Sequence, residues 1–155
     1  MRITQALLGE HGAIYPLFDL IEKTAAAAEL AELKIRANSL QWVISSHAVI
    51  EDEVLRPAIR AWLPEPDGPT DHEVINAGLK RVLSSTTAEE ARSAFVETIV
   101  LARKHFLKEE TVIFDIAGSE LSRELQEQLG AEWARRRGVF LPEATSIEKP
   151  RGASR

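Results

Sequence analysis

Cysteine is absent from the 155-residue sequence. This absence excludes disulfide bonds, thiolate zinc sites, iron–sulfur clusters and thiol catalysis. A metal ion could therefore bind only through nitrogen and oxygen atoms. The lack of cysteine fits a reducing compartment, and the N-terminal residues lack the long apolar core of a signal peptide, so we expect a cytoplasmic protein.

Long apolar runs and an excess of basic residues are also lacking. No run approaches the roughly 20 apolar residues of a transmembrane helix, so we expect no membrane span. The 19 Lys and Arg residues are outnumbered by 24 Asp and Glu residues, which gives a net charge of -5. Nucleic acids and anionic membranes attract basic patches, and we expect neither as a partner.

Glycine and proline are scarce, with 8 and 7 residues respectively. These numbers are too small for a fibrous or disordered chain, and 45% hydrophobic residues in a chain of this length suffice for the core of one domain. We expect this domain to cover residues 1–141, followed by a flexible C-terminal tail over residues 142–155. The sequence does not indicate an oligomeric state.

What the sequence does contain is helical periodicity. Branched apolar residues do not alternate with polar residues for long, so strands have little support. The pattern predicts an all-α fold, an antiparallel up-down-up-down four-helix bundle with an additional C-terminal helix. The expected helices cover residues 3–25, 29–61, 71–84, 88–116 and 119–137.

Several helix ends carry capping signals. Thr87 and Glu90 have the spacing of a capping box, and Ser119 is expected to cap the last helix similarly. Gly138 follows three arginines and is expected to end that helix. The last helix also carries an apolar stripe that we expect to pack on its own bundle, formed by Leu121, Leu125, Leu129 and Trp133.

The apolar seam of each of the first four helices is interrupted by a polar residue. When each helix is read at alternating steps of four and three, the interruptions are His11, His47, Glu51, His72, His105 and Glu109. A carboxylate in an apolar seam is costly to bury unless something neutralises it, and neither seam glutamate has a Lys or Arg in its own seam. A bound cation would supply the missing charge.

The register of the helices predicts that these residues meet. In two antiparallel helices joined by a turn, residues equally far from the turn lie at the same height. The mean of residue numbers 11 and 47 is 29, and the mean of 72 and 105 is 88.5; both fall at expected turns. Four imidazoles and two carboxylates suit two borderline metal ions and leave coordination positions open for a small molecule.

The order His, His-x-x-x-Glu, His, His-x-x-x-Glu resembles the hemerythrin-like, or HHE cation-binding, family over residues 3–117. The flanking segments HAVIEDEVLRP and HFLKEETVIF are similar to those of the family. The resemblance implies a helical bundle around an oxo- or hydroxo-bridged pair of iron ions that binds dioxygen, with four terminal imidazoles and two bridging carboxylates. Manganese or zinc could substitute for iron, because imidazole and carboxylate accept all three.

Glu109 departs from the oxygen-carrying hemerythrins, which have a fifth histidine at its place. An acidic ligand favours oxidised metals, and so favours sensing or redox chemistry over reversible oxygen carriage. The leading hypothesis is a di-iron protein that binds or senses dioxygen or a related small molecule. The alternatives are a di-iron redox enzyme that acts on peroxide or nitric oxide, and an interaction module with a structural metal.

Residues beside the seams have two possible roles. Tyr15 lies one turn beyond His11 and could donate a hydrogen bond near the metals or be partly exposed. Five acidic residues are expected on solvated faces, namely Glu10, Asp52, Glu53, Glu73 and Glu110, with a hydrogen bond to a ligand imidazole as the alternative for some of them. The Pro-rich segment from Trp62 to Asp71 must return close to His72 and is the candidate gate for ligand access.

Overall fold

The computed structural model of the chain describes residues 1–64 and 70–140, and every regular element in these ranges is helical. The all-α class is therefore confirmed for the described residues. The elements, in chain order, are α1 (Ile3–Thr24), η1 (Ala25–Ala27), α2 (Leu30–Ile50), η2 (Glu51–Leu55), α3 (Arg56–Ile59), η3 (Arg60–Trp62), α4 (Asp71–Ser84), α5 (Ala88–Lys108), η4 (Glu109–Ile113), α6 (Phe114–Glu120) and α7 (Arg123–Arg137).

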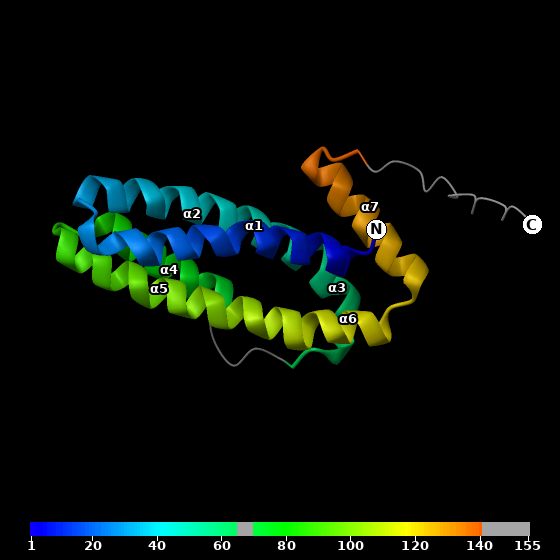
Figure 1. Cartoon of the computed structure of the whole chain (residues 1–155). Helices are drawn as coiled ribbons and strands as arrows, with labels where there is room; N and C mark the ends of the chain where they lie inside the picture. Colours follow the sequence, from blue (N-terminus) through cyan, green and yellow to red (C-terminus); the bar gives the residue numbers. More distant parts are fainter. Residues whose placement is uncertain (65–69, 141–155) are drawn as a thin grey trace, which may run out of the picture.

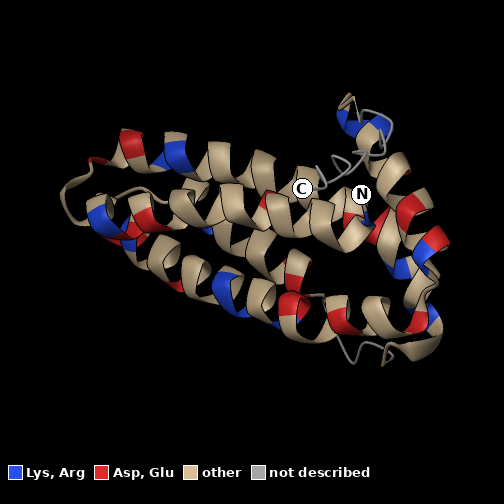
Figure 2. Ribbon diagram, turned by 45° about the vertical axis from the view of Figure 1, so that its right-hand side comes forward, with Lys and Arg blue, Asp and Glu red and all other residues tan. Residues whose placement is uncertain are grey.

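Helices α1, α2, α4 and α5 lie side by side along the molecule (Figure 1). α1 packs against α2, α2 against α4, α4 against α5, and α5 against α1. Acidic and basic residues are interspersed over the ribbon (Figure 2). Within the described ranges, no helix has the length and apolar character that crossing a bilayer requires.

The apolar interior consists of two clusters. One lies among α1, α2, α4 and α5 and contains Phe18, Leu40 and Phe95, and the other contains Leu7, Leu55 and Phe114. Each of α1 and α2 passes from one cluster to the other, and the polar seam residue lies at the crossing: His11 follows Leu7 of the second cluster and precedes residues of the first. The polar site is therefore enclosed between two apolar cores.

Two predicted helices are interrupted near their C-terminal ends. The helix expected over residues 29–61 changes from α2 to the π-helical η2, and the helix expected over residues 88–116 changes from α5 to the π-helical η4. A π-helical turn holds one more residue than an α-helical turn, so the faces after it are rotated. Simple α-helical periodicity could not anticipate this change.

The capping signals are confirmed at one helix and displaced at another. Thr87 caps α5 in the predicted capping box with Glu90. Ser122, and not Ser119, caps α7: its hydroxyl accepts a hydrogen bond from the backbone N–H of Leu125 at 3.2 Å. Ser119 lies within α6 and donates to a backbone carbonyl of that helix. The last helix therefore begins later than predicted, after an extended residue at position 121.

The end and the packing of α7 follow the sequence more closely. Gly138 adopts the left-handed conformation, with φ of 65°, at the end of the helix, as its position predicted. α7 packs against α1, and Leu121, Leu129 and Trp133 contribute to the second apolar cluster, so the expected self-packing is confirmed. Leu125 does not join them and is 37% exposed.

Two expectations fall on residues outside the described ranges. The flexible tail expected over residues 142–155 lies beyond residue 140. The candidate gate includes residues 65–69, which are likewise not described. Thr70, at the end of that segment, caps α4 in a capping box with Glu73.

Candidate metal centre

Both seam glutamates stand at the first position of a π-helical segment. Glu51 begins η2 and Glu109 begins η4, each four residues after a seam histidine. The two side chains are 0% and 1% exposed, respectively. π-helical turns inside α-helices often occur at functional sites, because they redirect side chains locally.

The structure brings all six predicted residues together in two groups of possible ligand atoms. The first group contains Glu51, His72, His105 and Glu109, and the second contains His11, His47 and Glu109. Within each group, the donor atoms lie within 4.8 Å of one another. Glu109 is the residue common to both.

The two oxygens of Glu109 face the two groups separately. Oε1 lies 2.8 Å from Nε2 of His105 and 3.6 Å from Nε2 of His72. Oε2 lies 3.3 Å from Nε2 of His11 and 3.8 Å from Nε2 of His47. This carboxylate therefore stands between the two halves of the site.

Glu51 has a different environment. Its Oε2 lies 3.3 Å from Nε2 of His72, and its Oε1 lies 3.3 Å from Nε of Arg56. The sequence predicted no Lys or Arg in the seam of Glu51, and this prediction is wrong because Arg56 lies beside its carboxylate. Residues five apart return to nearly the same face in a π-helix but not in an α-helix, and η2 separates this pair.

The electrostatics of the paired carboxylates disfavour two unneutralised charges. Burial raises the pKa of Glu51 to about 10, and the neighbouring Glu109 contributes in the same direction. Burial also acts to raise the pKa of Glu109, but the imidazoles of His105, His11 and His47 outweigh it and lower this pKa below its usual range. Positive charge close to both carboxylates would stabilise their ionised forms.

Unpaired buried atoms provide a test of whether a metal fits here. Among the described residues, both oxygens of Glu51 and of Glu109, and Nε2 of His72 and of His105, are buried and make no hydrogen bond of good geometry. Such groups are costly to bury unless something else satisfies them. Metal ions would satisfy all of these donor atoms together.

A second observation concerns His11 and His47, whose Nε2 atoms lie only 3.1 Å apart. Nδ1 of each ring lies 2.8 Å from a carboxylate oxygen, of Glu110 and of Glu10 respectively. If each Nδ1–H donates to its carboxylate, both Nε2 atoms carry lone pairs that face each other. A cation beside them would remove the repulsion, so the donor set fits a metal.

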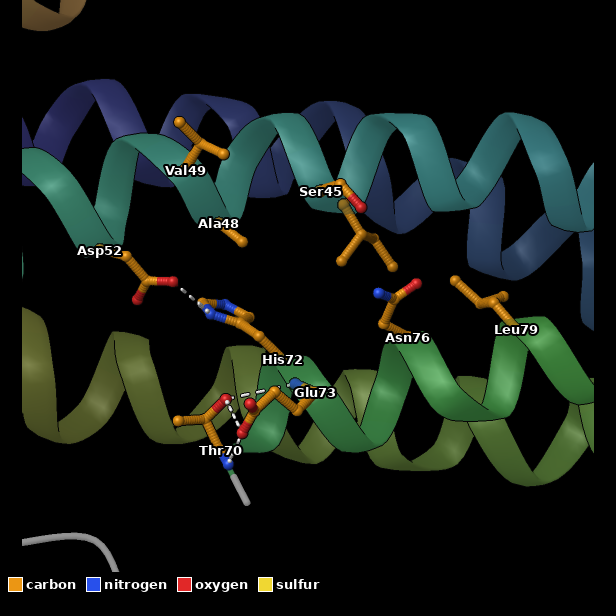
Figure 3. A pocket seen from close by; sticks show the side chains of 10 residues that line it. Ser45, Ala48, Val49, Asp52, Thr70, His72, Glu73, Asn76 and Leu79 are labelled. Atoms are coloured by element: carbon orange, nitrogen blue, oxygen red, sulfur yellow. Dashed lines mark hydrogen bonds and ion pairs between the residues drawn. The ribbon is translucent and has the colours of Figure 1, made fainter.

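Each of the four imidazoles has a carboxylate behind it. The Nδ1 atoms lie 2.8 to 3.5 Å from these oxygens in the pairs His11–Glu110, His47–Glu10, His72–Asp52 and His105–Asp71. Carboxylates at this position fix the tautomer and orientation of ligand imidazoles and raise their basicity. Figure 3 shows the contact between Asp52 and His72.

Glu10 and Glu110 do not lie on solvated faces, because their side chains are only 16% and 22% exposed. Asp52 is 49% exposed, as expected of a solvated face, and also contacts His72. Glu10, Asp52 and Glu110 are adjacent to seam residues in sequence, and their side chains reach the seam imidazoles. Glu53 pairs instead with Arg136, and Glu73 caps α4. Asp71 was missed, although its position one residue before His72 was an available signal.

Tyr15 takes the donor role that was one of its two expected roles. Its hydroxyl donates to Oε1 of Glu110 at 3.0 Å, and the same oxygen faces Nδ1 of His11. Burial and the adjacent Glu110 raise the pKa of Tyr15 to about 12. The tyrosine thus acts on the site through Glu110 and not at the seam itself.

Glu10 is held ionised by its partners. Burial acts to raise its pKa, but His47, Arg137 and Trp133 together lower it to about 2. Trp133 was expected to serve in packing alone, and Arg137 only at the end of its helix. Nothing in the local sequence of α7 connects either residue with residue 10.

A pocket of about 340 Å³ between α2 and α4 leads to the site. His72 and Asp52 lie at one end of it, and Ala48 faces it from α2 (Figure 3). The His72 side chain is 10% exposed, more than any of the other five residues. The pocket is therefore a possible access route from solvent to the donor groups.

No family model, curated protein or solved structure matches this chain.

Proposed function

We propose that this chain is a hemerythrin-like protein that holds two non-haem iron ions and binds or senses dioxygen or a related small molecule. In this proposal α1, α2, α4 and α5 form an antiparallel up-down-up-down four-helix bundle, and α7 is the additional helix. The observation that carries the proposal is the position of Glu109, whose two oxygens face separate groups of donors. A single metal ion would not require both groups.

In this proposal, each ion would be held by its own group of residues. Glu109 would bridge them, while Glu51, His72 and His105 complete one ligand group and His11 and His47 the other. The sequence suggested two bridging carboxylates, but Glu51 belongs to one group only, which favours a terminal role for it. Iron bound here would supply open coordination positions and electron transfer to a small ligand.

The surroundings of the donors support a reactive centre. Phe106 stacks on His11, with ring centroids 4.0 Å apart, and Phe114 lies on the same imidazole at 5.5 Å. These rings exclude water from one side of the site, while the pocket at His72 leaves the other side accessible. An entirely structural metal would need no such access.

A redox enzyme that acts on peroxide or nitric oxide is the second candidate. It is favoured by the acidic Glu109, which would stabilise oxidised metal. Steady-state consumption of peroxide or nitric oxide by the iron-loaded chain would distinguish this activity from stoichiometric binding.

The first experiment is to load the metal-free chain with ferrous iron without air, count iron per chain, and record the visible spectrum as oxygen is admitted. Two irons and a new absorption band support the proposal. Reversal of the band under vacuum would indicate carriage, and irreversible change would indicate sensing or catalysis. If iron binds stoichiometrically but the spectrum does not change with oxygen, an interaction module with a structural metal is the remaining interpretation. If no iron binds, the proposal is overturned.

A further inference from the structure

Helix α7 is closely docked on the N-terminal part of the chain. A methyl group at Gly130 would lie 2.2 Å from the carbonyl oxygen of Met1, so the two backbones approach as closely as only glycine permits. One turn later, the ring of Trp133 packs against the second apolar cluster. These contacts fix the position of the end of α7 relative to α1.

Two side chains of α7 converge on one carboxylate of α1. The indole N–H of Trp133 donates to Oε1 of Glu10 at 2.7 Å. The guanidinium of Arg137 donates to Oε1 and Oε2 of the same carboxylate at 2.7 and 3.2 Å. It also donates to the hydroxyl and the carbonyl oxygen of Ser46 at 2.6 and 2.8 Å.

The carboxylate that Trp133 and Arg137 bind, that of Glu10, is also the one that contacts Nδ1 of His47. Oε2 of Glu10 lies 2.8 Å from Nδ1 of that imidazole, and Ser46 is its immediate neighbour on α2. Arg137 therefore fixes both the backbone before His47 and the carboxylate that orients its ring. A bidentate guanidinium–carboxylate contact is geometrically specific, which suits it to this function.

We propose that Trp133 and Arg137 are positioning residues through which α7 sets the metal affinity of the His11–His47 half of the centre. This inference rests on the proposed metal centre and goes beyond it. The other half does not depend on these two residues, because Asp52 behind His72 pairs with Arg56 and Asp71 behind His105 pairs with Lys108. Loss of the contacts that Trp133 and Arg137 make with Glu10 should therefore lower the affinity for one of the two ions only.

Cobalt(II) titration of the metal-free chain tests this inference, with visible absorption and calorimetry as readouts. The unmodified chain should bind two ions. Arg137→Gln should lower the affinity for one of the two ions about 10- to 100-fold, the usual effect of removing a group that orients a ligand. The affinity for the other ion should be unchanged. Arg137→Lys, which keeps the charge but loses the forked geometry, should restore part of the loss.

Arg136→Gln is the matched control. It removes the same charge from the adjacent residue of α7, but Arg136 pairs with Glu132 and Glu53 and not with Glu10. Both cobalt affinities should remain unchanged in this variant. Trp133→Phe keeps an aromatic ring in the second cluster and removes only the N–H donor, so it repeats the test if Arg137→Gln folds poorly.

Normal binding of two ions by both Arg137→Gln and Trp133→Phe would overturn the inference alone. An equal loss of affinity for both ions would also overturn it, because that result indicates a general loss of structure. Failure of the unmodified chain to bind cobalt would overturn the proposed metal centre, and this inference with it.

Discussion

At the scale of single residues, Glu109 is the buried carboxylate that both donor groups share. It is 1% exposed, and its oxygens lie within 4 Å of four imidazole nitrogens. It is also next to the buried Glu51, whose ionisation it disfavours because the two negative charges would repel each other. A cation in the proposed centre would stabilise the ionised forms of both carboxylates.

Replacing this carboxylate should change both metal binding and stability, and the two effects can be measured separately. We expect Glu109→Gln to lose at least one of the two ions, because an amide offers one neutral acceptor where the carboxylate offers two charged ones. The metal-free variant should be less stable than the metal-free parent at neutral pH, because the imidazoles that lower the pKa of Glu109 stabilise its ionised form and lose this partner. Elemental analysis after iron loading and urea unfolding of the metal-free forms measure the two effects.

Glu97→Gln, on an exposed part of α5, is the control and should keep both ions. Retention of two tightly bound ions by Glu109→Gln would contradict a bridging role.

At the scale of elements, the interface between α4 and α5 depends on a small residue. A methyl group at Gly78 would lie 2.3 Å from Oγ1 and 3.0 Å from Cγ2 of Thr98, whose hydroxyl donates to the carbonyl of Ala94. The two helices that carry His72 and His105 can therefore approach closely only with glycine at this position.

Gly78→Ala should lower the free energy of unfolding by about 1–3 kcal/mol, the usual cost of overpacking a core. Gly12→Ala, in α1 with open space around the added methyl group, should instead be neutral or slightly stabilising. Urea unfolding measures both. A double variant with Thr98→Ala should recover part of the loss, and failure to do so would indicate that the clash is not the cause.

At the scale of elements, the pocket between α2 and α4 is also the possible access route from solvent to the site. Ala48 is 8% exposed and lines the pocket that ends at His72. Ala48→Leu should narrow this route and slow the binding of azide or nitric oxide to the iron-loaded chain about tenfold, a rise of about 1.4 kcal/mol in the barrier. Stopped-flow absorption measures the rate.

Iron content should stay unchanged in Ala48→Leu, because Ala48 supplies no ligand atom. Ala31→Leu, at an exposed position of the same helix that does not line the pocket, should leave the rate unaltered. Equal rates in all three chains would place the access route elsewhere.

At the scale of the whole molecule, the polar site lies between two apolar clusters, and its possible ligand residues come from α1, α2, α4 and α5 and from the π-helical turns that follow α2 and α5. Metal binding should therefore stabilise the entire fold. At a free metal concentration 100 times Kd the gain is about 2.7 kcal/mol for one ion. For a chain of this size that gain corresponds to a rise of roughly 5–10 °C in Tm.

Calorimetry of the metal-free and iron-loaded chains under anaerobic conditions checks this expectation. Addition of a chelator should return the Tm to the metal-free value. A Tm that does not respond to metal would mean that the ions bind outside the buried seams.

The sequence by itself determined the all-α class, the Thr87 and Gly138 helix ends, and the six residues that meet in the core. These features follow from local rules: helical periodicity puts His11, His47, His72 and His105 on buried seams, and equal distance from a turn puts them at one height. Both rules need only residue spacing. They do not need knowledge of how one helix is rotated against another.

The tertiary structure decided the features that depend on rotation and on contacts distant in sequence. The π-helical turns at Glu51 and Glu109 bring Arg56 beside the site and leave Glu109 common to both donor groups. Each imidazole is paired with a carboxylate from a different helical element, and the docking of α7 brings Arg137 to Glu10. Side-chain reach across helix interfaces determines these contacts, and no periodicity within one helix encodes it.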